Sequence, residues 1–233
     1  MNIKTIVSTL LLFTPIISLA AGGDDPLLSK IMIDQLEQRN GDKEDPVVLE
    51  AEMWIGKDLN KFWLKSEVEQ VEGKTEEAEV QALYSRAITP YWDLQTGWRR
   101  DYKPEPQQDW FVLGVDGLAP YFFEVGASLF IGEDNRSAFR FEAEYEIMLT
   151  QRLVLSPEIE LNFYGKDDKE HAIGSGLADS EIGLRLRYEF WREFAPYIGI
   201  TREAKHGRTA DMAIAKGEET EETQAVAGFR FWF

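Results

Sequence analysis

The sequence predicts an all-β fold: a transmembrane, antiparallel, up-and-down β-barrel of about 12 strands. Long stretches alternate apolar and charged residues with the two-residue period of a strand. Short turns alternate with longer polar loops along the chain, as they do in outer-membrane barrels. The stretch 225–233 (AVAGFRFWF) is also typical of a strand, with Phe229, Phe231 and Phe233 on one side. These apolar rings would face lipid.

The first residues have the pattern of a secretory signal peptide. Lys4 supplies a positive charge, residues 6–19 are mostly apolar, and small residues favour cleavage after Ala20, with Ala21 as the alternative. No later stretch has the roughly 18 apolar residues that a membrane helix needs. We therefore expect a signal peptide over 1–20, a short periplasmic segment over 21–30 and an outer-membrane barrel over 31–233.

The composition narrows the class of function. The formal net charge of -17 excludes nucleic-acid binding as a main role, because phosphate contacts need clustered Lys and Arg. Such a charge suits the attraction of cations or simple solubility. The chain has 0 Cys, so packing and hydrogen bonds, rather than disulfides, have to hold the exported protein.

Three stretches alternate most regularly, at residues 137–149, 153–163 and 181–190. Phe139, Leu155 and Leu184 represent their apolar sides, which would contact lipid, while the charged sides would point into an enclosed lumen. The lumen residues that we take as candidate site residues are Arg140, Glu142, Glu144, Glu146, Glu158, Glu160, Arg185 and Arg187.

The charge in this predicted lumen is mixed, with acids in excess. Adjacent strands would set Glu142 and Glu144 near Glu158 and Glu160, and carboxylates so close together attract a cation. Alternatively, the arginines neutralise them in a buried ionic network that fills a narrow barrel, since a guanidinium satisfies carboxylates well. We expect neutralisation for most of them, which leaves an acidic interior suited to a small cation rather than to a sugar or an anion.

The connections predict that one rim of the barrel carries short turns and the other carries longer polar loops. Aromatic residues cluster near the short turns, as in an interfacial girdle, and no stretch after residue 40 is convincingly helical. The short turns lie at residues 89–91, 119–121, 150–151 and 191–196. The longer polar loops are expected at residues 40–46, 71–77, 101–109, 132–136, 165–178 and 206–220.

The strand count predicts one further strand. About eleven strands follow Val47, yet a barrel with both ends in the periplasm needs an even number. Residues 31–37 (IMIDQLE) are the candidate for the missing strand. Their pattern also fits a short helix, so the parity of the barrel, rather than propensity, favours the strand.

Candidate metal ligands are few. The chain has 2 His, both in expected long loops, and no cluster of His or Met at short spacing. Met148 lies on the charged side of its strand, where apolar packing does not explain a Met. Copper prefers imidazole nitrogen and thioether sulfur, so the candidate ligands are Met148, His171, His206 and Met32.

Several stretches resemble a known family. They include residues 85–97 (SRAITPYWDLQTG), 117–124 (GLAPYFFE), 143–146 (AEYE) and 151–153 (QRL). The most similar block runs through residues 174–177 (GSGL), 183–189 (GLRLRYE) and 194–197 (FAPY). From about residue 31 to its end, the chain resembles the copper resistance protein B family.

The resemblance implies an outer-membrane barrel of a Gram-negative bacterium that takes part in copper handling. The copper ion would be transported or transiently bound, and a periplasmic copper oxidase is an implied partner. Family members commonly carry a Met- and His-rich segment before the barrel, whereas residues 21–30 here contain neither residue. We expect a monomer that contacts outer-membrane lipid and the barrel assembly machinery, which would recognise the strand ending at Phe233.

Three classes of function follow. The leading hypothesis is a copper-tolerance barrel that binds or conducts copper ions through an acidic lumen. The alternative is a generic small-cation diffusion channel with no copper specificity, although a narrow barrel packed with side chains should conduct poorly. A barrel enzyme, with Ser175 and His171 as nucleophile and base, is not expected, because catalysis also needs an orienting group and an oxyanion site.

Overall fold

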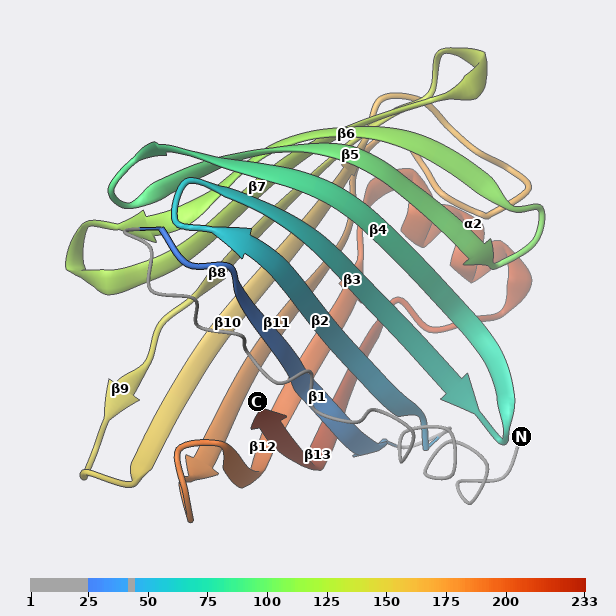
Figure 1. Cartoon of the computed structure of the whole chain (residues 1–233). Helices are drawn as coiled ribbons and strands as arrows, with labels where there is room; N and C mark the ends of the chain where they lie inside the picture. Colours follow the sequence, from blue (N-terminus) through green and yellow to red (C-terminus); the bar gives the residue numbers. More distant parts are fainter. Residues whose placement is uncertain (1–24, 42–44) are drawn as a thin grey trace.

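The computed structural model describes residues 25–41 and 45–233, and in them the chain forms a closed antiparallel β-barrel (Figure 1). Closure comes from β1 pairing with β13 and from β10 pairing with β11. The signal peptide expected over residues 1–20 lies outside the described residues. The strands of the described part are β1 (Leu28–Asn40), β2 (Val47–Lys57), β3 (Asn60–Val71), β4 (Lys74–Thr89), β5 (Trp92–Lys103), β6 (Gln108–Ala119), β7 (Phe123–Gly132), β8 (Ser137–Glu144), β9 (Ile147–Met148), β10 (Leu153–Tyr164), β11 (Gly176–Tyr188), β12 (Phe194–Lys205) and β13 (Glu221–Trp232).

Strands β8 and β9 form one span, so the described sheet is a 12-stranded barrel. Both pair with β10 in the same register, Glu144 opposite Glu158 and Met148 opposite Val154. The break between them lies opposite Pro157, which has no N–H to donate to the ladder, although Tyr145 N–H still donates to the Pro157 carbonyl at 3.1 Å. The predicted twelve strands are therefore confirmed.

The parity argument correctly predicted the first strand. Residues 31–37 lie inside β1, which begins at Leu28 and pairs with β2 and β13. A short helix, the other interpretation of this stretch, would have left β2 and β13 without their common neighbour. The need to close the sheet, rather than the ambiguous local pattern, therefore decides that residues 31–37 form a strand.

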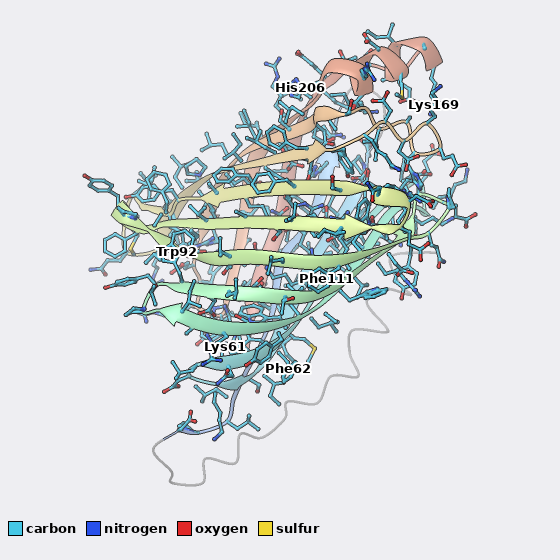
Figure 2. The ribbon with its side chains drawn as sticks, turned by 90° about the horizontal axis from the view of Figure 1, so that it is seen from above. Lys61, Phe62, Trp92, Phe111, Lys169 and His206 are labelled. Carbon is cyan, nitrogen blue, oxygen red and sulfur yellow. The ribbon has the colours of Figure 1, made fainter. Side chains whose placement is uncertain are left out.

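The connections define two rims, which we call the short-turn rim and the long-loop rim. Figure 2 shows Trp92, at the start of β5, at one end of the barrel and Lys169 and His206 at the other. The short-turn rim consists of residues 58–59, 90–91, 120–122, 149–152 and 189–193. The described long-loop rim consists of residues 72–73, 104–107, 133–136, 165–175 and 206–220.

One connection of the long-loop rim was predicted wrongly. Residues 71–77 were expected to form a longer polar loop, but β3 and β4 meet at a turn of two residues, Glu72 and Gly73. Both have positive φ, 49° and 79°, the backbone of a type I′ hairpin turn whose twist matches the flanking strands. The polar residues after the turn therefore continue β4 as a strand.

A helix on the same rim was also missed. The loop expected over 206–220 contains α2 (Gly207–Lys216), which packs on β11 and β12. The helix ends at Gly217, whose φ of 78° is the left-handed conformation typical of helix C-caps. In the described part of the chain, no helix is long and apolar enough to cross a membrane.

The outer face of the barrel is apolar at the predicted positions. Phe139, Leu184 and Phe229 are exposed on it, although each lies within a hydrogen-bonded strand. Aromatic residues are also exposed at the short-turn rim, among them Tyr121 and Trp191. An apolar band with aromatic rings at its edge is the surface that a bilayer requires.

The lumen also has an apolar layer, which the sequence alone did not reveal. Leu83, Trp110, Val112, Phe130 and Ala138 are buried together inside the barrel, with Trp63 and Tyr164 packed against them. Most of them occupy one cross-strand row, in which Val112 lies opposite Phe130 and Phe130 opposite Ala138. We call this group the apolar layer.

The lipid-facing surface makes a direct prediction. Leu184→Arg should lower the free energy of unfolding from lipid vesicles by about 2–4 kcal/mol, because it places a charge on the lipid side near mid-strand. Ile214→Arg, on an exposed position of α2, is the matched control and should change little. Equal losses in urea titrations followed by Trp fluorescence would contradict the assigned faces.

Candidate functional site

A cavity of about 610 Å³ occupies the inside of the barrel. Its wall is acidic: among the described residues, twelve carboxylates line it against four cationic side chains. The cationic residues are Lys30, Lys65, Arg140 and Arg230. The acidic residues are Asp34, Glu50, Glu52, Glu67, Glu79, Asp116, Glu124, Glu142, Glu144, Glu158, Glu160 and Glu181.

Carboxylates form a continuous row across the sheet, which we call the acidic row. Each member lies directly opposite the next on the neighbouring strand, and one position is a glycine. From β5 to β13 the row consists of Asp93, Asp116, Gly126, Glu142, Glu160, Glu181, Glu203 and Glu222.

The acidic row crosses the barrel from one rim to the other. Asp93 is the second residue of β5, beside the short-turn rim, and Glu222 is the second residue of β13, beside the long-loop rim. At about 4.8 Å per strand the row covers roughly 34 Å of sheet. With strands tilted by about 40°, it climbs roughly 22 Å along the barrel axis, close to the ~25 Å apolar band of such barrels.

Gly126 makes room for two carboxylates in this row. A Cβ at this position would lie 2.8 Å from Glu142 Oε2 and 3.6 Å from Asp116 Oδ2. Both acids therefore lean over the glycine from its two neighbouring strands. A side chain here would push them apart, so the absence of one keeps the row continuous.

Arginines cross the lumen and pair with the carboxylates, as the sequence predicted. Arg140 on β8 reaches Glu79 on β4 at 3.1 Å, across the three strands that separate them in the sheet. Arg99 on β5 binds the same carboxylate at 2.8 Å and Asp101 at 2.7 Å. The Arg140–Glu79 pair therefore ties distant walls of the barrel together, while Arg99 joins neighbouring strands.

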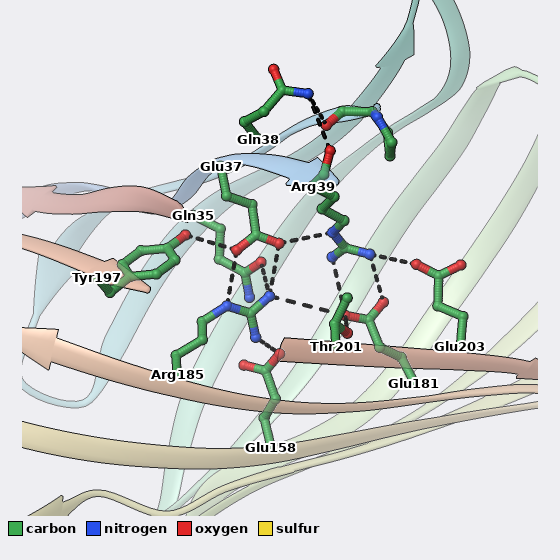
Figure 3. A network of polar contacts seen from close by, with 11 residues as sticks. Gln35, Glu37, Gln38, Arg39, Glu158, Glu181, Arg185, Tyr197, Thr201 and Glu203 are labelled. Atoms are coloured by element: carbon green, nitrogen blue, oxygen red, sulfur yellow. Dashed lines mark hydrogen bonds and ion pairs between the residues drawn. The ribbon is translucent and has the colours of Figure 1, made fainter. Parts of the chain in front are cut away.

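A second network joins β1 to β11 and β12 (Figure 3). Glu37 is only 1 % exposed, and its carboxylate accepts hydrogen bonds from Arg39 at 2.8 Å, from Arg185 at 2.8 and 2.9 Å and from the Tyr197 hydroxyl at 3.0 Å. Arg185 also pairs with Glu158. The two guanidinium groups compensate the burial of Glu37, since an unpaired buried carboxylate would be costly.

A third group lies toward the short-turn rim. Glu146 sits in the break between β8 and β9, where it accepts hydrogen bonds from Arg187 at 2.5 Å and from Arg230 at 3.1 Å. Arg230 also pairs with Asp34 at 2.7 Å. Glu146 and Arg187 are therefore structural ion-pair partners in this structure, whereas Glu142, Glu144 and Glu160 line the cavity.

Some cavity carboxylates make no close ion pair within the described residues. Glu124 lies directly opposite Glu144, and Glu144 directly opposite Glu158. The members of this set with no ion pair or side-chain hydrogen bond within the described residues are Glu50, Glu52, Asp116, Glu124 and Glu144. They leave negative charge facing the cavity.

The four candidate copper ligands do not come together. Met32 is 7 % exposed, lines the cavity and lies opposite Glu52, with its Sδ 3.8 Å from Arg230 Nη2. Met148 is 66 % exposed in β9 and does not line the cavity. Of the two methionines, Met32 alone presents its thioether to the acidic interior.

Both histidines lie at the long-loop rim, but their partners differ. His171 packs against Asp168, Gln108 and the carbonyl of Pro106, while the ring of His206 contacts the Ser180 hydroxyl at 2.8 Å. Burial alone would raise the pKa of Asp168, but hydrogen bonds from the His171 backbone and side chain and from Gln108 hold it below its ordinary value. His171 thus anchors the loop at 165–175 to the barrel.

Two other features bear on chemistry. In the described residues, no group of three or more His, Asp and Glu side chains is arranged to hold a metal ion. The Ser175 backbone N–H donates to Asp167 at 2.9 Å. The ring of His171 contacts Gln108, Asp168 and the Pro106 carbonyl instead. Ser175 and His171, the nucleophile and base of the enzyme alternative, are therefore not joined by a hydrogen bond in the described structure.

Comparison with known proteins identifies the family of the chain. The family model described as "Copper resistance protein B precursor (CopB)" matches residues 27–233. The chain belongs to the copper resistance protein B family. Copper resistance protein B of Escherichia coli is 43% identical over 203 residues, which cover 87% of this chain and 69% of that protein. A copper resistance protein B homolog of Pseudomonas syringae pv. tomato is 43% identical over 210 residues, covering 90% and 71%.

Solved structures with a similar fold are outer-membrane porins. A NanC porin superposes with a TM-score of 0.58 at 13% identity, covering 88% of this chain and 99% of that one. A KdgM porin gives a TM-score of 0.53 at 14% identity, covering 87% and 98%. At these identities the likeness shows the fold alone. This copper resistance protein B family member is an outer-membrane β-barrel.

The Glu37 network predicts a large stability effect. Glu37→Gln should lower the free energy of unfolding by about 3 kcal/mol or more, because Arg39 and Arg185 lose a buried counter-charge. Urea unfolding from vesicles measures the loss. Glu105→Gln, which alters an exposed loop pair with Lys103, should leave the midpoint unchanged, and similar shifts for both variants would refute the assigned role.

Proposed function

We propose that this barrel passes copper ions across the outer membrane through its acidic lumen. The observation that carries the proposal is the acidic row, which places a carboxylate at nearly every strand between the two rims. Membership of the copper resistance protein B family supports copper as the cargo.

The charge balance of the cavity favours a cation. Acidic side chains outnumber basic ones three to one along the described wall, and low-dielectric walls focus such a field. Glu50, Glu124 and Glu144 also line it and make no ion pair within the described residues. A cation in the cavity gains attraction from several carboxylates, while an anion is repelled.

Met32 supports copper over other cations. Its thioether lies in the acidic cavity opposite Glu52, and sulfur donors select copper over hard cations such as magnesium. Met148, His171 and His206 were also candidates. We propose Met32 as the transient ligand among the four, because the other three do not line the cavity.

The alternative is a small-cation channel with no copper specificity. Apart from Met32, the side chains of the described cavity wall that can bind a metal ion offer carboxylate, amide or hydroxyl oxygen. Carboxylate oxygen suits magnesium, calcium and manganese as well as it suits copper. Selectivity is therefore the property that separates the two hypotheses.

We further infer a binding or conducting role rather than an enzymatic one, supported by the family and by the porin-like fold. A periplasmic copper oxidase is a proposed partner, since such an enzyme would consume or supply copper at the short-turn rim. Outer-membrane lipid and the barrel assembly machinery are the other proposed partners, and the proposed oligomeric state is a monomer.

Deleting the gene tests the function in cells. We expect altered copper tolerance and altered cell-associated copper, both restored by the native gene. Met32→Leu conserves volume and should restore neither fully, whereas Met148→Leu should restore both. Unchanged tolerance and copper content after deletion would refute a role in copper handling.

Selectivity is measured with purified barrels in vesicles. Uptake of copper should exceed uptake of magnesium by about tenfold, and Met32→Leu should remove most of that preference, because the remaining donors are hard. Equal uptake of both ions by the native barrel would favour the generic channel.

A further inference from the structure

Arg140 is one of the four cationic side chains that line the described acidic cavity, and four carboxylates surround it. Its guanidinium lies 3.1 Å from Glu79, 3.4 Å from Glu160, 3.8 Å from Glu67 and 4.0 Å from Glu142. A single positive charge is therefore shared by four carboxylates, of which Glu79 alone has a second arginine partner, Arg99. The group remains negative overall with Arg140 in place.

Arg140 also lies at the boundary of the apolar layer. Its guanidinium carbon is 5.9 Å from the centre of the Phe130 ring, and that of Arg99 is 4.6 Å from the same ring. Phe130 and Trp63 line the cavity as well. Arg140 therefore lies in the cavity wall directly beside the buried apolar side chains of this layer.

The position of Arg140 relative to the acidic row is specific. Its cross-strand partners are Ser128 and Asn162, one inward position from the row members Glu142 and Glu160. From there the guanidinium reaches across the lumen to Glu67 and Glu79 on β3 and β4. It therefore bridges the acidic row to the opposite wall.

We propose that Arg140 is a tethered counter-cation that restricts cation passage through the lumen. It occupies the place that a permeating cation would take among Glu67, Glu142 and Glu160, so an ion enters by exchanging with the guanidinium rather than by filling an empty site. The role rests on the acidic cavity of the proposed function but applies to any small cation.

The bond geometry supports exchange rather than permanent closure. Arg140 is anchored to Glu79 by a hydrogen bond, while its contacts with Glu67 and Glu142 are longer. Arg99 remains to neutralise Glu79 when Arg140 moves. A cation that binds Glu142 and Glu160 can therefore replace the guanidinium without leaving Glu79 unpaired.

Planar bilayers with potassium chloride test this role without copper. Arg140→Gln should raise cation conductance by about threefold or more at low ionic strength, where screening is weakest, and should make the reversal potential more cation-selective. Arg202→Gln is the matched control: it makes the same change in net charge at an exposed outward position on β12. It should leave both quantities unchanged.

An Arg140→Gln barrel with native conductance and reversal potential would overturn the proposal. Folding is checked by the heat-dependent gel mobility of the barrel. Should Arg140→Gln fail to fold, Arg140→Lys is the second variant, because it keeps the charge but loses the two-sided fork of the guanidinium. Arg140→Lys should conduct more than the native barrel. Native conductance of this variant would again overturn the proposal. Because the salt is potassium chloride, failure here is distinct from failure of copper transport.

Discussion

The structure depends on charge compensation inside a closed barrel. A bilayer requires every strand to be paired and the outward side chains of the membrane-spanning band to be apolar, so polar residues within that band turn inward. Within the described lumen they meet as carboxylates in excess, and arginines from non-neighbouring strands neutralise part of that charge. The ion pairs that hold the walls together therefore also decide how much negative charge is left for a passing ion.

This constraint links stability to function. Glu37 is fully paired and buried, and it ties β1 to β11 and β12. Glu124 and Glu144, by contrast, face each other across β7 and β8 and make no close ion pair within the described residues. The barrel thus separates carboxylates that stabilise the fold from carboxylates that are available to a ligand. Arg140 belongs to both groups by its role. It bridges the walls of the barrel, and in our proposal it competes with a passing cation for the cavity carboxylates.

The sequence predicted the features that local periodicity determines, namely the strands and the two faces of each. Strands β8, β10 and β11 alternate strictly, so their faces and lumen residues followed directly, and the parity of the barrel located β1. It did not predict the turn at Glu72 and Gly73, helix α2 or the apolar layer, because β6 and β7 carry apolar residues on both faces. Pairs such as Glu37 with Arg185 were also hidden, since closure and stagger of the barrel decide which distant strands face each other.

The most direct test is the reactivity of single cysteines, because the native chain has 0 Cys. Cysteines placed in turn at residues 139 to 144 report which face of β8 meets the aqueous lumen. The positions of Glu142 and Glu144 should react with a water-soluble reagent, faster when that reagent is cationic than when it is anionic, and those of Phe139 and Phe141 should not react. Equal labelling along the strand, or faster labelling by the anionic reagent, would contradict an acidic, enclosed lumen.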